Sequence, residues 1–272
     1  MNTSPQLLHA ITGDPSNPLK EPTFAVADEN GNVFVADSGN HLVKVFDPKG
    51  KFLFQFGGQE SKKPLLYPYG IGVLNKERII VADTGAGALY EYNAQGEQVR
   101  AWLEPGAGSQ PAGVFVAPDK TVYVTDLAGK KVLVFSEPGQ LLRKIEPQNV
   151  SLGSPLGIEV NLDGTVWVAD GGNYNIKLMG KDALVKAVFD GGPKNPLSMA
   201  KGLAVDKQGR IYVADTMSNA VRVFDGQGND LFTLGRDKEN TFRLPNGLSI
   251  DKTGKIYIAD QGNNKIQVWG WK

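Results

Sequence analysis

Short runs of hydrophobic residues, many of them alternating with polar residues, follow one another along almost the whole chain. Val221-Arg222-Val223-Phe224 alternates, and the preceding run, Ile211-Tyr212-Val213-Ala214, is rich in β-branched and aromatic residues. Both patterns are typical of β-strands, and turn residues such as Asp225-Gly226-Gln227-Gly228 follow them. No window of useful length has the 3.6-residue period of a helix. The pattern therefore predicts an all-β protein.

This strand pattern occurs six times. Each copy contains a Val-Ala-Asp-like phrase, and the six aspartates, 43 to 46 residues apart, are Asp37, Asp83, Asp126, Asp170, Asp215 and Asp260. Fifteen residues before each aspartate stands the head of a Pro-x-Gly-like phrase, and nine residues after it stands an aromatic residue or Met. A period near 45 residues with four strands per copy predicts a six-bladed β-propeller.

We expect a single domain whose blades each contain four antiparallel strands. The expected blades cover residues 22–57, 68–103, 111–146, 155–190, 200–235 and 245–270. The sixth copy ends after its third strand, whereas residues 7–13 at the N-terminus resemble the fourth strands of other copies, such as Phe52–Gly57. The N-terminal strand is therefore expected to close the last blade and cover an edge that would otherwise pair with other chains.

The repeats resemble NHL repeats, in which a Pro-x-Gly phrase opens one strand and Val-Ala-Asp ends the next. The best local matches are Lys201–Phe224 and Pro245–Trp269, and the resemblance covers essentially the whole chain. It implies the propeller fold. It also implies binding of a protein, an RNA or a small ligand more often than catalysis.

Composition narrows the classes of partner. Lys plus Arg equals Asp plus Glu at 29 each, and this neutrality argues against nucleic acid and anionic membranes as partners. The absence of cysteine excludes disulfides and thiol chemistry. No apolar run approaches the roughly 20 residues of a membrane span, and the first residues lack the features of a signal peptide. We expect a soluble monomer of unknown compartment; an extracytoplasmic location, with an anchor or signal removed upstream, is one alternative.

Features shared by all six copies are interpreted as structural. An aspartate before a tight turn accepts backbone N–H bonds and can fasten neighbouring strands. The glycine of Pro-x-Gly allows close approach of the backbone. The second-strand aromatics stand at one repeat position and are expected to pack between blades; they are Tyr123, Trp167, Tyr212 and Tyr257.

Function is expected where the copies differ. The connections from fourth to first strands vary in length and share a face with the second-to-third turns, so this loop-rich face at the channel mouth is the expected binding face. The alternative is that these loops vary because nothing constrains them. The residue between Pro and Gly also differs, being Thr23, Tyr69, Ala112, Leu156, Lys201 and Asn246 in chain order. Tyr69, Lys201 and Asn246, with Thr23 beside them, are candidates to bind a carboxylate, a carbonyl or a sugar hydroxyl, or else are ordinary solvated side chains.

A single charged residue stands out two places beyond the Pro-x-Gly glycine. The residues at this position are Val26, Gly72, Phe115, Glu159, Ala204 and Ser249. A buried carboxylate must be hydrogen-bonded, ion-paired or protonated. Lys201 in the neighbouring copy is the expected partner of Glu159, in a structural ion pair; a cation or ligand bound in the channel is the alternative.

Two alternatives to a non-catalytic binding scaffold stay open. One is a divalent-cation-dependent lyase or hydrolase, resembling the gluconolactonase and strictosidine-synthase type, in which Glu159 and Asn246 would hold Ca²⁺ or a similar cation. No catalytic residue is predicted, because His9 and His41 are the only histidines and both are expected far from the axis. The other is RNA binding by a basic loop patch of Lys62, Lys63, Tyr67, Tyr69, Arg236, Lys238 and Arg243. No cofactor is expected.

Overall fold

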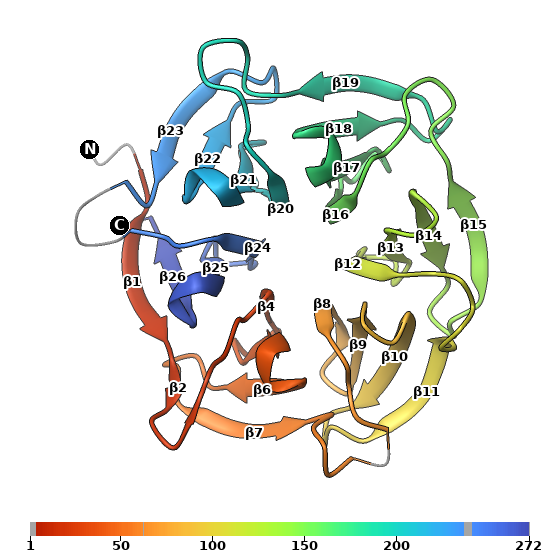
Figure 1. The fold of residues 1–272 in the computed structure, drawn as a ribbon, viewed down its shortest axis with the longest axis vertical. Helices are drawn as coiled ribbons and strands as arrows, with labels where there is room; N and C mark the ends of the chain where they lie inside the picture. Colours follow the sequence, from red (N-terminus) through yellow and green to blue (C-terminus); the bar gives the residue numbers. More distant parts are fainter. Residues whose placement is uncertain (1–3, 62, 237–240, 272) are drawn as a thin grey trace.

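The computed structural model describes residues 4–61, 63–236 and 241–271. In this part of the chain, six four-stranded antiparallel sheets stand side by side around a central axis (Figure 1). A two-stranded hairpin, β2 (Gly13–Asp14) with β3 (Asn17–Pro18), leads into the first of them. The predicted all-β, six-bladed propeller is confirmed.

Each blade runs from an inner strand at the axis to an outer strand at the rim. Blade 1 contains β4 (Phe24–Ala27), β5 (Val33–Asp37), β6 (Leu42–Phe46) and β7 (Phe52–Phe56). Blade 2 contains β8 (Pro68–Asn75), β9 (Arg78–Asp83), β10 (Ala88–Asn93) and β11 (Gln98–Leu103). Blade 3 contains β12 (Pro111–Val116), β13 (Val122–Asp126), β14 (Lys131–Phe135) and β15 (Leu141–Ile145).

The remaining blades follow the same order until the last one. Blade 4 contains β16 (Pro155–Val160), β17 (Val166–Asp170), β18 (Asn175–Met179) and β19 (Val185–Phe189). Blade 5 contains β20 (Ala200–Val205), β21 (Ile211–Asp215), β22 (Ala220–Phe224) and β23 (Asp230–Leu234). Blade 6 contains β24 (Pro245–Ile250), β25 (Ile256–Asp260), β26 (Lys265–Gly270) and, as its outer strand, β1 (Gln6–Ile11).

The N-terminal strand closes the ring, as predicted. β1 pairs antiparallel with β26, with Gln6 opposite Gly270 and Ile11 opposite Ile266, and the pairing has one irregularity between Leu7 and His9. Ile11 is only 1% exposed because it packs into the core between blades 6 and 1. The two ends of the chain thus meet within one blade (Figure 1).

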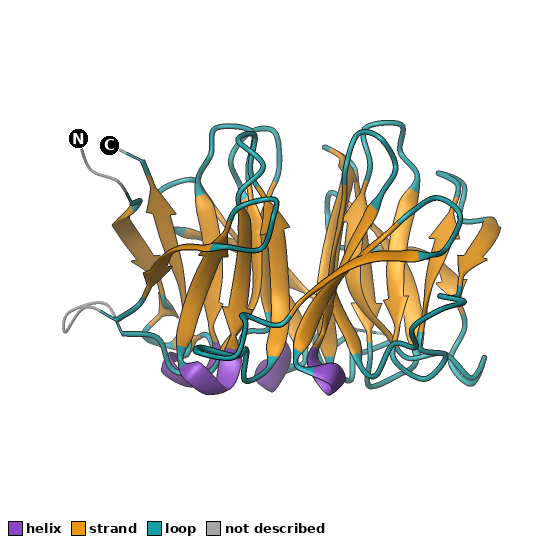
Figure 2. Ribbon diagram, turned by 90° about the horizontal axis from the view of Figure 1, so that it is seen from above, coloured by secondary structure: helices purple, strands orange, loops and turns teal. Residues whose placement is uncertain are grey.

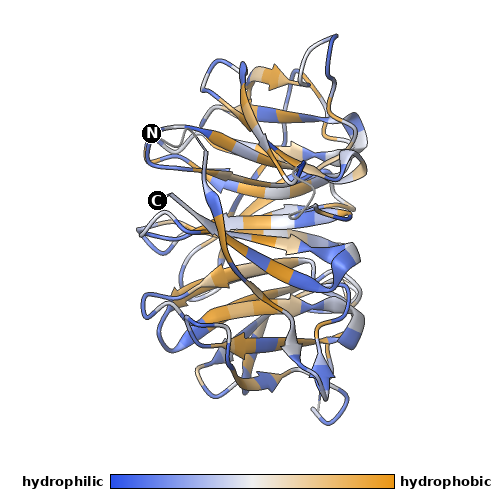
Figure 3. Cartoon of the chain, turned by 90° about the vertical axis from the view of Figure 1, so that its left-hand side faces the viewer, coloured by the Kyte–Doolittle hydropathy of each residue, from blue (hydrophilic) through white to orange (hydrophobic). Residues whose placement is uncertain are grey.

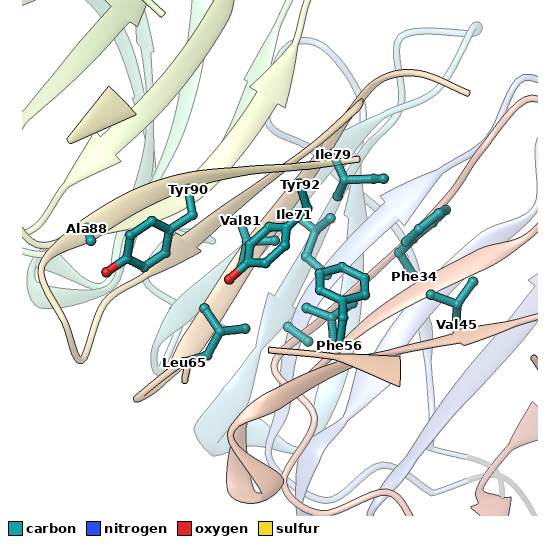
Figure 4. Close-up of a cluster of buried hydrophobic side chains, with 12 residues drawn as sticks. Phe34, Val45, Phe56, Leu65, Ile71, Ile79, Val81, Ala88, Tyr90 and Tyr92 are labelled. Atoms are coloured by element: carbon teal, nitrogen blue, oxygen red, sulfur yellow. The ribbon is translucent and has the colours of Figure 1, made fainter. Parts of the chain in front are cut away.

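The hydrophobic core lies between the blades. The described residues form six buried clusters, each joining the facing sheets of two neighbouring blades. Figure 4 shows the cluster between blades 1 and 2, where Phe56 packs against Tyr92 with ring centroids 4.7 Å apart. The second-strand aromatics predicted to pack between blades are all buried in such clusters. Apolar residues therefore follow the strands, and hydrophilic residues gather at the turns (Figure 3).

The two faces of the ring are built from different connections. The second-to-third turns include four 3₁₀ turns, η1 (Ser38–Asn40), η2 (Gly171–Asn173), η3 (Thr216–Ser218) and η4 (Gln261–Asn263), which lie on one face (Figure 2). The fourth-to-first connections reach the same face, so we call it the loop face. The first-to-second and third-to-fourth turns form the opposite face, which we call the hairpin face. Across the described residues, no helix has the length and hydropathy to cross a bilayer.

Candidate binding site at the channel mouth

The inner strands crowd together where they begin, on the loop face. A Cβ atom added to Gly113 would lie 2.1 Å from the carbonyl oxygen of Leu156, and one added to Gly202 would lie 2.3 Å from that of Asn246. These contacts are shorter than any side chain tolerates, so only glycine permits this approach of neighbouring strands. The Pro-x-Gly glycines therefore bring the variable residues before them to the axis.

Blade 1 departs from this pattern, because Phe24 stands where the other blades have glycine. Phe24 lines the axial channel, and its ring lies so close to Gly247 that a Cβ added there would be 2.4 Å from it. The channel is consequently narrow at this end, with a cavity of about 20 Å³ lined by Phe24, Tyr69 and Lys201, among others. Such a space holds about one water molecule.

Two of the predicted site residues form a buried polar network across the mouth. The Tyr69 hydroxyl of blade 2 donates to Asn246 Oδ1 of blade 6 at 2.7 Å, and Asn246 Nδ2 donates to Gln261 Oε1 at 2.9 Å. Burial raises the pKa of Tyr69, so its hydroxyl keeps its proton and acts as a donor. The network fixes both side chains in place.

Thr23 belongs to the same wall of the mouth. Its hydroxyl is fully buried and lies 2.6 Å from the Ser38 hydroxyl, which donates to the carbonyl oxygen of Pro68 at 2.5 Å. These bonds join blade 1 to blade 2. Hydrogen bonds between blades therefore hold Thr23, Tyr69 and Asn246 in place at the mouth.

Lys201 has a different environment. It lies near the start of β20, is half-buried, and lines the same cavity as Tyr69. Burial lowers the pKa of its ammonium group, and within the described residues it has no hydrogen-bond or ion-pair partner. Leu156, half-buried in blade 4, and Ala112, buried in blade 3, offer it no polar group. Lys201 therefore carries the unused donors of the mouth.

The predicted ion pair of Glu159 with Lys201 is wrong. Glu159 lies near the end of β16 and lines a separate, wide cavity on the hairpin face, whereas Lys201 lines the narrow end. Burial raises the pKa of Glu159 to about 8, and a hydrogen bond from the backbone N–H of Val205 opposes that rise only in part. The sequence interpretation placed both residues at the axis without separating the two ends of the channel.

The repeated aspartates have the structural role predicted for them. Asp83 accepts the backbone N–H groups of Leu66 and Tyr67 at 2.8 Å each. Asp170 accepts those of Gly153 and Ser154 in the same way. Each carboxylate thus fastens the connection that precedes its own blade, and this holds the loop face in shape.

Two features of the channel escape the sequence interpretation. The first is the ring of Phe24, whose signal is the missing glycine in the first Pro-x-Gly phrase. The second is the wide cavity around Glu159. Its only sequence signal is weak: blade 3 has Phe115 and blade 4 has Glu159 at the same repeat position. Both depend on how side chains fill the axis, which the repeat pattern does not specify.

The enzyme alternative requires ligands for a divalent cation, and the RNA alternative requires an exposed basic patch. Among the described residues, no three His, Asp or Glu side chains gather closely enough to hold a metal ion. Of the basic patch, Lys63, Arg236 and Arg243 are exposed on the connections of the loop face, Tyr67 is half-buried, and Tyr69 is buried. Lys62 and Lys238 lie outside the described residues.

Solved structures show the class of the fold. The chain matches a streptogramin B lyase over 97% of its own length and 98% of that chain, with a TM-score of 0.70 and 14% identity. It matches the WD40 β-propeller domain of Doa1 over 100% and 98%, with a TM-score of 0.68 and 11% identity. At such identities the likeness concerns the fold alone. The chain is a β-propeller.

The sequence comparisons identify its repeats. The NHL repeat model matches residues 19–46, 197–224 and 242–269. Relatives include the Drosophila melanogaster protein brain tumor, 32% identical over 46% of this chain and 12% of the relative. Another is the Mus musculus E3 ubiquitin-protein ligase NHLRC1, 32% identical over 56% of this chain and 39% of the relative. The chain therefore contains NHL repeats and is similar to NHL-repeat proteins, and it spans well under half the length of these two.

Proposed function

We propose that the protein is a non-catalytic binding scaffold that recognises a protein or a small ligand through the loop face at the mouth of the central channel. Lys201 carries this proposal, because its half-buried ammonium group has no partner among the described residues while the polar side chains around it are satisfied. A group in this state gains most from an incoming acceptor. The favoured ligand group is a carboxylate or a carbonyl oxygen.

The buried network prepares the mouth for such a ligand. Tyr69, Asn246 and Thr23 are fixed by hydrogen bonds between blades, so little side-chain freedom is lost when a ligand binds beside them. Their proposed role is to position the ligand while they keep their hydrogen bonds to one another and to the backbone. The variable connections around the mouth supply the larger contact area that a protein partner needs.

Site-specific photo-crosslinking tests the proposal. A photoreactive amino acid replaces Leu156 at the mouth in one variant and Lys207, on the hairpin face, in a control variant. Crosslinked products in extract of the source cells are expected from position 156, and Lys201→Met in the same chain should remove them. Identical products from both positions, or products that persist after Lys201→Met, would contradict a site at the mouth. Unchanged melting of Lys201→Met establishes that the fold is intact.

A further inference from the structure

The channel opens on the hairpin face into a cavity of about 1110 Å³. Its rim consists of the first-to-second turns of blades 4, 5 and 6. Its volume is slightly above the roughly 300–1,000 Å³ of typical small-molecule sites. The charged groups that line it with Glu159 are Asp163, Asp206, Lys207, Arg210, Asp251 and Lys252. None of them is a histidine.

The charged groups of the rim are occupied by local contacts. Lys207 Nζ donates to the carbonyl oxygen of Lys252, and Arg210 Nε donates to Asp206 at 2.6 Å. Lys252 Nζ pairs with Glu29 at 2.7 Å. Asp163 and Asp251 accept hydrogen bonds from residues of their own turns. In the described part of the chain these groups contact one another, Glu29 or their own turns, and none of them pairs with Glu159.

Glu159 is the carboxyl group without such an arrangement. Its hydrogen bond comes from the Val205 backbone N–H, and no side-chain cation lies within ion-pair distance of it in the described part of the chain. Because a carboxylate has room for about four hydrogen bonds, most of its acceptor capacity is unused. It is half-buried at the base of the cavity and belongs to the inner strand β16.

Apolar side chains surround this carboxyl group. Phe115, at the same repeat position in the preceding blade, lines the cavity together with Val160, Val205 and Ile250. The cavity therefore combines a charged rim with apolar side chains and one unpaired carboxyl group at its base, and such a base is complementary to an apolar body that carries one positive charge.

We propose that the cavity on the hairpin face is a binding site for a small organic cation, with Glu159 as the counter-ion of its ammonium group and Phe115 as part of the apolar wall. This site is separate from the mouth on the loop face. It would be occupied independently of a partner bound there, because the constriction at Phe24 and the Pro-x-Gly glycines lies between them.

The environment of Glu159 makes binding dependent on pH. In the empty cavity its pKa is raised to about 8, so it is largely protonated at pH 6. A cation binds the ionised form, and it must therefore displace a proton at low pH. Affinity for a permanently charged ligand is expected to rise by more than about tenfold between pH 6 and pH 8.

The test uses 4-fluorobenzylammonium, followed by its ¹⁹F NMR signal, because this probe keeps its charge from pH 6 to pH 8. The affinity of the wild-type protein for this cation is expected to rise by more than about tenfold from pH 6 to pH 8. The neutral 4-fluorobenzyl alcohol should bind at least about tenfold more weakly than the cation at pH 8. In Glu159→Gln the amide oxygen still accepts the Val205 N–H but cannot ionise. This variant should lose at least about tenfold in affinity and its pH dependence.

Asp119→Asn is the matched control, because Asp119 is an exposed acid on the hairpin-face turn that follows β12 and lies outside the cavity lining. Its affinity should stay within about twofold of the wild type, since exposed charges contribute little. Equal losses of affinity in both variants would show that the cation is attracted by acidic residues in general and not by a specific site at Glu159. Binding that weakens as pH rises, or that favours the alcohol, would make Glu159 a hydrogen-bond donor to neutral ligands and overturn the proposal. No binding of the cation at millimolar concentrations, in protein with unchanged melting, would overturn it as well.

Discussion

At the residue scale, the aspartates that end the second strands are equivalent in sequence but not in their surroundings. The Asp170 carboxylate lies 2.5 Å from Lys177 Nζ, and both side chains are buried. Burial by itself raises the pKa of Asp170, but hydrogen bonds from Lys177, Gly153 and Ser154 bring it below its usual value. At the position of Lys177, blade 3 has the buried Leu133, and Asp126 accepts the backbone N–H of Gln110 without a buried cation beside it.

This difference predicts unequal costs of the same substitution. Asp170→Asn should lower the free energy of unfolding by about 3–5 kcal/mol, because it leaves the Lys177 ammonium buried without a counter-charge. Asp126→Asn should cost only about 1–2 kcal/mol, the scale of weakened hydrogen bonds to a backbone N–H. Denaturant unfolding of both variants measures this, and Lys177→Met added to Asp170→Asn should recover much of the loss. Equal costs at the two positions would remove the proposed role of Lys177.

The residues that single out a site could be read from the sequence, but their distances could not. Lys201 and Glu159 differ from their counterparts in the other blades, and this difference makes both of them candidates in the sequence. Their repeat positions lie three residues apart along an inner strand, which separates them by about 10 Å along the axis. The position of a residue in the repeat indicates how close its side chain lies to the axis, but it indicates less well where along the axis the side chain lies. The expected ion pair was wrong for this reason.

At the element scale, β1 is the strand that turns an open array of blades into a ring. Its pairing with β26 was predictable, because residues 7–13 share the pattern of the other outer strands. The irregularity between Leu7 and His9 and the hairpin β2–β3 were not, since both result from fitting the chain between blades 6 and 1. Without β1, β26 would expose an unpaired edge.

Deletion of residues 1–13 is therefore expected to lower the melting temperature by at least about 10 °C, because it removes both the β1 pairing and the buried side chain of Ile11. Aggregation that increases with protein concentration should accompany the loss. A chain that lacks only residues 1–4 is the control and should melt like the wild type. Equal melting of the two shortened chains would contradict closure by β1.

At the scale of the whole molecule, a six-fold frame carries a channel whose two ends differ. The fixed intervals of the repeat predicted the frame, because each interval corresponds to a strand and its turn. These intervals did not predict which end of the channel is narrow. That depends on the Phe24 side chain at one end and on the cavity between the turns of blades 4, 5 and 6 at the other. The side chains that break the repeat therefore divide between two proposed sites, with Lys201 on the loop face and Glu159 on the hairpin face.

The central claim, recognition at the mouth on the loop face, is tested most directly by titrating ¹⁵N-labelled protein with benzoate. We predict that the amide signals of Lys201, Asn246 and Tyr69 shift together as the carboxylate binds the Lys201 ammonium group, and that Lys201→Met abolishes these shifts. Shifts confined to the turns of the hairpin face, or shifts at the mouth that persist in Lys201→Met, would contradict the account.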